Sequence, residues 1–276
     1  MTMGIIYACI APHGSEAIPE LAGDKLNAFG ETRRGMEYLA KQMKRHCPHT
    51  IVIATPHGLR LDHTIGVVTT EYSEGSLKEK DKVIKARFRC NRQLARKILQ
   101  ETRKAWLPTV GANYGTNKGP ASCMQMDWGT LIPLWFFGAQ ERNKPKIVIV
   151  TPSREIPLTQ LVDFGKTIAE VAESSQRKVA FAASADQGHT HDKKGPYGFH
   201  PASKEYDELV IKAVKEGNLK QLLTLDSQFV EDAKPDSLWQ MAILAGVLER
   251  VRMKARFVSY QVPTYFGLLC ASFERQ

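Results

Sequence analysis

The sequence predicts an α/β protein, built as a single three-layer domain whose central twisted, mostly parallel or mixed sheet is flanked by helices. Short apolar runs alternate with amphipathic segments along most of the 276 residues. No internal repeat, low-complexity tract or linker divides the chain, so we expect one domain over residues 1–276. A chain of this length can bury one substantial core.

The first strands and the first helix follow from local patterns. Residues 3–10 (MGIIYACI) and 50–55 (TIVIAT) are short, apolar and rich in β-branched side chains, as expected of buried strands. Residues 31–46 between them have the spacing of an amphipathic helix. Residues 63–72 and 82–89 alternate apolar and polar side chains, which is typical of half-exposed strands.

The middle of the chain continues this alternation. A helix is predicted at 90–105, and residues 108–128, rich in Gly, Pro, Asn and Ser, are predicted to form a long loop. Loops of that length are uncommon and often functional. Residues 129–139 (GTLIPLWFFGA) are typical of a buried helix, and 145–153 (PKIVIVTPS) of a strand that ends in a turn.

The last part of the chain closes the predicted sheet. A helix at 157–174 leads to a strand at 178–184 and then to a polar, turn-rich loop. In open α/β sheets, ligands bind beyond the carboxyl ends of the strands, so polar residues that directly follow strands are candidates for a site. The remaining predicted elements are helices at 203–216 and 237–250 and strands at 254–261 and 266–273.

The charge distribution bears on the class of partner. The net charge is +9, and residues 78–104 carry eleven Lys or Arg against three acidic residues. A solvated strand and helix face explains this excess, and attraction of an anionic small substrate is the functional alternative. No nucleic-acid-binding motif or interleaved aromatic pattern accompanies it, so we expect no nucleic-acid partner.

Cysteine usage and hydropathy indicate a compartment. The five cysteines are scattered and form no CxxC pair, which favours reduced thiols over a disulfide framework or a zinc site. No apolar run approaches the roughly 20 residues of a membrane span. The first residues enter a strand pattern without the features of a signal peptide. We therefore expect a cytoplasmic protein that does not bind membranes.

Two predicted strands end in the same tripeptide, Pro-His-Gly, at His13 and His57. A proline favours extended backbone before each histidine, and a glycine permits a sharp turn after it, so both imidazoles project over the sheet edge. A turn or capping role would explain one such histidine. Because neutral imidazole is the commonest metal ligand, two in matching settings favour a shared metal ion.

A third histidine cluster lies in the polar loop after the strand at 178–184. His189, His191 and His200 fall within 12 residues. A solvated histidine-rich loop is one interpretation. The other is a general acid/base that faces the metal, since imidazole titrates near neutral pH.

Four segments together resemble the class III extradiol ring-cleavage dioxygenases. The similarity is to the catalytic subunit of protocatechuate 4,5-dioxygenase and its relatives, a superfamily that includes the Memo proteins. It runs through nearly the whole chain in the same order and spacing. The segments are APHGSE (11–16), TPHG (55–58), DWGTLIPLWF (127–136) and SADQGHTHDKKGPYGFHPASKEYD (184–207).

The resemblance implies a metal site and a catalytic base. In that family two histidines and one carboxylate hold a non-haem Fe(II) and leave positions for substrate and oxygen. His13 and His57 match the histidine ligands, and His189 matches the acid/base histidine. A 2-His-1-carboxylate set is also the ligand signature of iron oxygenases on chemical grounds.

The carboxylate ligand departs from the family pattern. Relatives use a glutamate near the start of a late helix, and counting back from Gly246 leads here to Asp236. Memo proteins carry a cysteine at that place. Asp236 also suits an ordinary helix N-cap after proline. Glu231 and Asp232 are the alternative ligands.

A second departure concerns the substrate. Many relatives read Asp-His-Gly where this chain has Asp127, Trp128 and Gly129, so Trp128 either walls an aromatic pocket or belongs to the core. Because this chain has no histidine at that position, the usual substrate of the family is in doubt. The residues expected to bind or orient the substrate are Asp127, Trp128, His191 and Tyr197, with His200 in support.

These observations favour an Fe(II)-dependent extradiol dioxygenase that opens a catecholic or aminophenolic ring with O₂. A basic rim would suit a substrate carboxylate. The alternatives are a Memo-like binding protein without this activity and a zinc-dependent hydrolase, which metal content would distinguish. A homo-oligomer is expected, and a small partner subunit, as in some relatives, is an open question.

Overall fold

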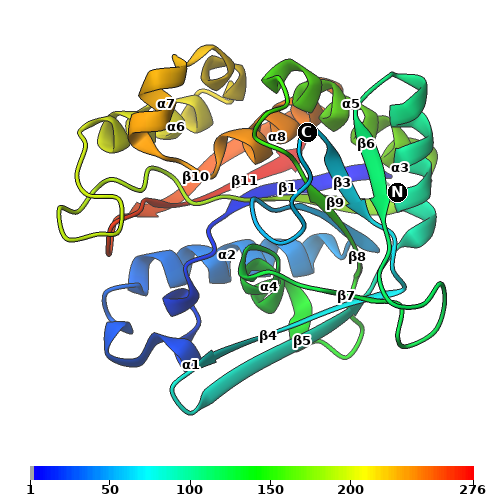
Figure 1. Cartoon of the computed structure of the whole chain (residues 1–276), viewed down its shortest axis with the longest axis horizontal. Coiled ribbons are helices and arrows are strands. Elements are labelled where there is room, and N and C mark those ends of the chain that lie inside the picture. The colour runs from blue at the N-terminus through cyan, green and yellow to red at the C-terminus, as the bar shows by residue number, and fades with distance from the viewer. Residues whose placement is uncertain (1–2) are drawn as a thin grey trace.

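The computed structural model describes residues 3–276 and contains a mixed eight-stranded sheet in the order β10-β11-β1-β9-β2-β8-β3-β6 (Figure 1). The four central strands β1, β9, β2 and β8 run parallel, whereas β11 and β3 pair antiparallel to their inner neighbours. The predicted α/β class with a mixed sheet is therefore confirmed. The strands are β1 Gly4–Ala11, β2 Thr50–Ala54, β3 Ile65–Val68, β6 Thr109–Ala112, β8 Lys146–Thr151, β9 Lys178–Ser184, β10 Met253–Gln261 and β11 Leu268–Arg275.

Helices cover both faces of this sheet, and each face has its own apolar core. Successive side chains of a strand point to opposite faces, so Val67 packs into one core and Val68 into the other. The first face carries α3 Arg92–Lys104, α5 Leu158–Ser174, α6 Ala202–Lys215, α7 Ser227–Ala233 and α8 Leu238–Arg250. The second carries α2 Gly30–His46, α4 Trp128–Leu134 and a small sheet of β4 Tyr72–Glu79, β5 Lys82–Arg89 and β7 Cys123–Gln125. Shorter elements are α1 Pro19–Ala22, the 3₁₀ turns Ser15–Ala17, Gly23–Lys25 and Leu219–Thr224, and a π-helical turn at Trp135–Ala139.

Besides the strand β4 and the short helical elements at 15–25, for which nothing was predicted, the observed elements depart from the predicted ones in three places. The run 63–72 is not a half-exposed strand: its ordered part, β3, is fully buried between β8 and β6. The predicted loop 108–128 contains the short strands β6 and β7, which extend the large and the small sheet. Residues 219–233, for which no element was predicted, form a 3₁₀ turn and α7. In each case tertiary pairing or packing stabilises a segment with a weak local pattern.

Helix α8, which follows the candidate ligand Asp236, is held close to α5 by two glycines. A Cβ atom on Gly165 would collide with the carbonyl of Ile243, and one on Gly246 would collide with the carbonyl of Val162. Glycine at both positions lets the two helix backbones touch, and this contact fixes where α8 begins.

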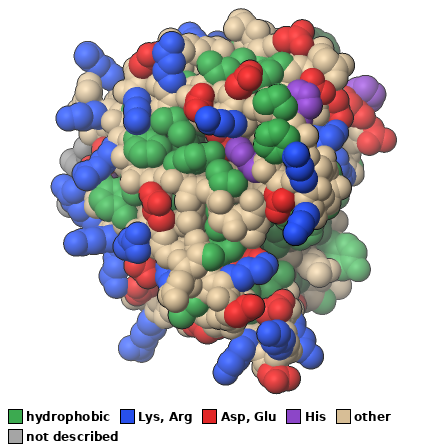
Figure 2. Space-filling view, turned by 90° about the vertical axis from the view of Figure 1, so that its left-hand side faces the viewer, with side chains coloured by type: hydrophobic (Ala, Val, Ile, Leu, Met, Phe, Trp, Pro, Cys, Tyr) green, Lys and Arg blue, Asp and Glu red, His purple; other side chains and the backbone are tan. Residues whose placement is uncertain are grey.

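The side of the molecule with the loop 185–201 is shown in Figure 2, where hydrophobic side chains gather around a histidine with Lys and Arg beside them. Among the described residues, no helix combines the length and the apolar character needed to cross a bilayer. All five cysteines are free thiols, and three are buried.

Candidate metal centre

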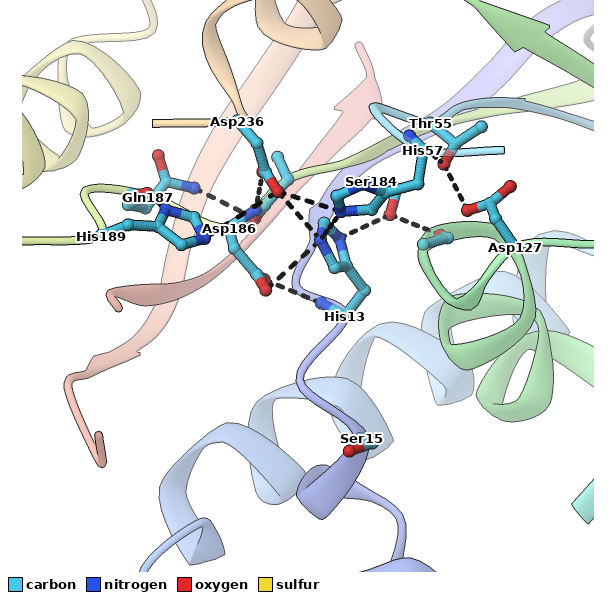
Figure 3. Close-up of polar contacts among 12 residues, drawn as sticks. His13, Ser15, Thr55, His57, Asp127, Ser184, Asp186, Gln187, His189 and Asp236 are labelled. Carbon is cyan, nitrogen blue, oxygen red and sulfur yellow. Dashed lines mark hydrogen bonds and ion pairs between the residues drawn. The ribbon is translucent and has the colours of Figure 1, made fainter. Parts of the chain in front are cut away.

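Three adjacent strands deliver the predicted site residues to one edge of the sheet (Figure 3). His13 follows β1, His57 follows β2, and His189 lies in the loop after β9. Asp236 comes from a different segment, just before the N-cap residue of α8. The carboxyl ends of parallel strands meet at one edge, which is why residues so far apart in sequence converge.

His13, His57 and Asp236 form a compact triangle of possible ligand atoms. The Nε2 atoms of His13 and His57 lie 3.2 Å apart, and each lies 3.2 Å from Oδ2 of Asp236. A metal ion about 2.0–2.2 Å from each ligand separates neighbouring ligands by about 3.0–3.5 Å. The triangle therefore has the size of one face of a metal coordination shell.

The tautomer of His13 follows from its hydrogen bonds. The Ser184 hydroxyl donates its only proton to the carbonyl of Gly129 at 2.5 Å. Its oxygen therefore accepts from Nδ1–H of His13 at 2.9 Å. Neutral His13 then has a lone pair on Nε2, directed at the other two ligand atoms, as metal-bound histidines require.

Such convergent lone pairs need a cation between them. Burial opposes protonation of His13, but the carboxylates of Asp186 and Asp236 outweigh it and raise the pKa of His13 to about 9. Without a metal, a proton thus occupies the place where the ion would lie. The donor set, two imidazoles and one carboxylate, fits non-haem Fe(II) and also accommodates zinc.

Asp236 lies with the two histidines and does not cap a helix. Ser237 occupies the N-cap position of α8, and the helix has no side-chain cap there. Oδ1 of Asp236 accepts the backbone N–H of Asp186 at 3.0 Å, which turns Oδ2 toward the histidines. Burial raises the pKa of Asp236, but His13 and hydrogen bonds from His13 and His57 hold it well below its usual range.

The alternative carboxylates lie elsewhere. Glu231 and Asp232 belong to α7, where Glu231 is exposed and pairs with Lys234 at 2.7 Å. Asp232 accepts a hydrogen bond from Gln228 at 3.0 Å. Neither joins the histidine pair among the described residues.

A second buried carboxylate, Asp186, was missed in the sequence analysis. Its Oδ1 accepts the backbone N–H of His13 at 2.8 Å, and its Oδ2 lies 3.4 Å from Nε2 of the same histidine. Burial and the nearby Asp236 raise the pKa of Asp186 to about 6, although His13 opposes the shift. Its place two residues after β9 is the signal that could have identified it.

His189 stands beside the triangle and outside it. Its Nε2 lies 4.0 Å from Oδ2 of Asp236. Its Nδ1–H donates to the backbone carbonyl of Gln187 at 2.7 Å, since a carbonyl can only accept. The Nε2 lone pair of neutral His189 is therefore free to take a proton next to the candidate metal.

Aromatic rings flank the centre on two sides. Trp128 stacks on His57, with ring centroids 4.1 Å apart, and is 47% exposed, so it does not belong to the core. Phe266 stacks on His189 at 5.4 Å, and Tyr197 and Tyr265 each lie 6.0 Å from the same ring. Trp128 and Tyr197 are among the residues predicted from the sequence, whereas Tyr265 and Phe266, just before Gly267 and β11, are not.

Asp127 contacts the protein's own backbone and hydroxyls. As the N-cap of α4 it accepts from the backbone N–H of Thr130 at 2.9 Å and from the Thr130 hydroxyl at 2.8 Å. It also accepts from the hydroxyl of Thr55, two residues before His57, at 2.8 Å. These contacts hold the loop that carries His57.

His191 and His200 are not brought to the ligand triangle. Nε2 of His191 donates to Oδ2 of Asp207 at 2.9 Å, on the other side of the loop. His200 is exposed at the start of α6, where its Nδ1 accepts the backbone N–H of Ala202 at 3.2 Å.

Comparison with known proteins places the chain in context. A family model described as the catalytic LigB subunit of aromatic ring-opening dioxygenase matches residues 7–268. A curated protein of Clostridium acetobutylicum is 26% identical over 253 residues, which are 91% of this chain and 54% of that protein. The chain thus spans about half the length of this relative. A crystal structure of an uncharacterized protein of Escherichia coli K12 shares the fold, with a TM-score of 0.58 at 13% identity over 97% of this chain and 99% of that one.

Proposed function

The chain belongs to the family of catalytic LigB subunits of aromatic ring-opening dioxygenases, and we propose that it is a non-haem Fe(II)-dependent extradiol dioxygenase. We further propose that its substrate is a catecholic or aminophenolic ring and that O₂ is the second substrate. One observation carries the proposal: the triangle of His13, His57 and Asp236 lies beside the free Nε2 of His189, between aromatic side chains.

In this proposal His13, His57 and Asp236 hold the iron. When bound, Fe(II) would acidify the coordinated ring hydroxyl and bring ring and oxygen together. Ser184 keeps the His13 lone pair aimed inward, and Asp186 orients both His13 and Asp236. The protein thus supplies a fixed three-ligand face and the groups that keep it in place.

His189 is the proposed general acid/base. Its Nδ1–H is fixed by the Gln187 carbonyl, so Nε2 accepts the proton of a substrate hydroxyl and later returns it. Trp128 on one side and the rings of Tyr197, Tyr265 and Phe266 on the other would confine a planar substrate.

We also propose that residues 1–276 act as one catalytic domain in the cytoplasm. Five free thiols support this compartment. A homo-oligomer and the absence of a nucleic-acid partner remain expectations, and the need for a small partner subunit stays an open question.

A zinc-dependent hydrolase is the second candidate, and Asp186 is the observation that favours it. A second buried carboxylate 3.4 Å from a metal-ligating imidazole would suit activation of a water molecule. The Memo-like binding protein loses part of its support, because a carboxylate lies within 3.2 Å of both histidines.

The test is anaerobic loading of the purified protein with Fe(II) or with Zn²⁺, followed by a panel of catechols and aminophenols in air-saturated buffer. We expect O₂ uptake and coloured ring-opened products from the iron-loaded protein alone. Hydrolysis of esters or amides by the zinc form, without O₂ uptake by the iron form, would support the hydrolase. Failure to bind either metal would support the binding protein.

A further inference from the structure

The turn that begins α4 lies against the histidines of the metal centre. It consists of Asp127, Trp128 and Gly129, and we call it the α4 turn. Figure 3 shows Asp127 on the His57 side of the centre. Each residue of the turn contacts a ligand histidine or a hydroxyl that supports one. The two histidines are held in different ways, and this difference assigns a role to Trp128.

His13 is held by hydrogen bonds through the side of its ring that faces away from the ion. Its Nδ1–H donates to the Ser184 hydroxyl at 2.9 Å, and that hydroxyl donates to the carbonyl of Gly129 at 2.5 Å. The side chain of His13 is only 2% exposed. A metal-bound histidine usually donates its second ring N–H in this way, which fixes both the tautomer and the direction of the ring.

His57 has no such bond. Its ring makes polar contacts through Nε2, to His13 and to Asp236, and none through Nδ1 with any residue in 3–276. Its side chain is 19% exposed, which makes it the more accessible of the two histidines. Hydrogen bonds to the fold therefore do not set the plane of this imidazole, and another contact must do so.

The indole of Trp128 provides that contact. It stacks on the imidazole of His57, with ring centroids 4.1 Å apart and 30° between the ring planes. Such stacking is attractive and restricts rotation of the ring. An imidazole bound to a divalent cation is poor in electrons, and the face of an indole is the best aromatic partner for positive charge. The stack therefore stabilises the metal-bound form of His57 more than the metal-free form.

Trp128 is in turn held against the His57 loop by its neighbours in the α4 turn. Asp127 accepts from the hydroxyl of Thr55 at 2.8 Å. A Cβ atom on Gly129 would lie 2.7 Å from Oγ1 of Thr55 and 3.2 Å from Cδ2 of His57. Only a residue without a side chain lets the turn come so close, and this approach brings the indole onto the imidazole.

We propose that Trp128 is a positioning residue for the metal ligand His57. Its indole, and not a hydrogen bond, sets the ring plane in which Nε2 points at the ion. The more exposed histidine is then the ligand whose hold on the metal depends on stacking. This inference rests on the proposed metal centre and gives Trp128 a role separate from confinement of the substrate.

The first test measures metal affinity and does not depend on turnover. Fe(II), under anaerobic conditions, and Zn²⁺ are titrated in competition with a chromophoric chelator. We expect Trp128→Ala to weaken the binding of both ions about tenfold. Trp128→Phe should restore most of this loss, because a phenyl ring still stacks on His57. Trp106→Ala, which removes a 92% exposed tryptophan just after α3, is the matched control and should bind metal as the parent does.

Gly129→Ala tests the same contact without changing the indole. The helical backbone at this position accepts alanine, but the new Cβ must displace the Thr55 hydroxyl or the His57 ring. Metal affinity should therefore fall about tenfold. Gly30→Ala, at the first residue of α2, is the matched control, since the nearest atom to its new Cβ is 3.5 Å away. This control should leave metal affinity unchanged.

The melting temperature of the metal-free protein distinguishes positioning from a general effect on the fold. Trp128 is 47% exposed, so metal-free Trp128→Ala should melt close to the parent. The rise in melting temperature at a fixed Zn²⁺ concentration should be smaller in the variant, because ligand-induced stabilisation follows affinity. A large fall in the metal-free melting temperature, with an undiminished rise on adding Zn²⁺, would overturn the positioning role.

The outcomes separate this inference from the proposed function. Parent-like metal affinity in Trp128→Ala, or an equal loss in Trp128→Ala and Trp128→Phe, would overturn the inference and leave the ligand triangle intact. Failure of the parent protein to bind either ion would overturn the proposed function and this inference with it.

Discussion

The loop after β9 carries two histidines two residues apart, His189 and His191, and the structure turns them toward different carboxylates. Oδ2 of Asp236 lies 3.2 Å from Nε2 of His13 and of His57, and 4.0 Å from Nε2 of His189. Asp207, bonded to His191, accepts hydrogen bonds from three donors: Gly188 N–H at 2.7 Å, His191 Nε2–H at 2.9 Å and the Tyr260 hydroxyl at 2.6 Å.

This difference indicates that the Asp236 cluster is suited to bind a ligand, whereas the Asp207 cluster supports the structure. Two imidazoles and a carboxylate whose ligand atoms converge favour a cation between them, whereas the charge of Asp207 is already compensated by three hydrogen bonds. The Asp207 cluster joins α6, β10 and the loop, and thereby holds His189 in position.

The first prediction compares the two histidines in catalysis. His189→Ala should retain iron and bound substrate but lower turnover about 10²- to 10⁴-fold, because a general acid/base is lost. His191→Ala should cost much less. Single-turnover kinetics on iron-loaded variants, with metal content measured alongside, makes the comparison. Full activity in His189→Ala, or loss of its iron, would show that the role belongs to another residue.

The second prediction compares the two carboxylates in stability. Asp207→Ala should lower the free energy of unfolding by about 3–5 kcal/mol, because the buried Gly188 N–H and two partly buried side-chain donors lose their acceptor. Denaturant unfolding of the metal-free protein measures this change. Tyr260→Phe, which removes one donor, should cost only about 1 kcal/mol. If Asp207→Ala were as stable as the parent, the supporting role of this cluster would be refuted.

The third prediction uses the proton that competes with the metal. With its pKa raised to about 9, His13 is protonated at pH 7 in the metal-free protein, so the metal must displace that proton. Apparent affinity should rise about tenfold per pH unit from 7 toward 9 and then level off. Chelator competition at several pH values measures the slope. An affinity that is flat over this range would contradict the assigned protonation of His13.

Much of the metal centre could be predicted because its determinants are local. His13 and His57 directly follow strands with clear apolar patterns, so the sheet edge on which they meet was predictable. Asp236 required counting from a resembling family, since nothing local separates a ligand from an N-cap. Asp186 was also predictable in principle, as a carboxylate just beyond β9.

The orientation of His191 was not predictable from local pattern. The histidine cluster and the family resemblance led to the prediction that His189 and His191 both lie at the site. The contact that turns His191 away comes from Asp207 in α6, and it exists only once the helix has packed.

The most direct test of the central claim is metal stoichiometry in a matched pair of variants. Fe(II) is titrated anaerobically into the parent protein, His57→Ala and His191→Ala, with bound metal measured by elemental analysis after desalting. We expect about one ion per chain in the parent and in His191→Ala, and little in His57→Ala. One ion retained by His57→Ala, or its loss in His191→Ala, would contradict the assignment of the metal to the His13–His57–Asp236 triangle.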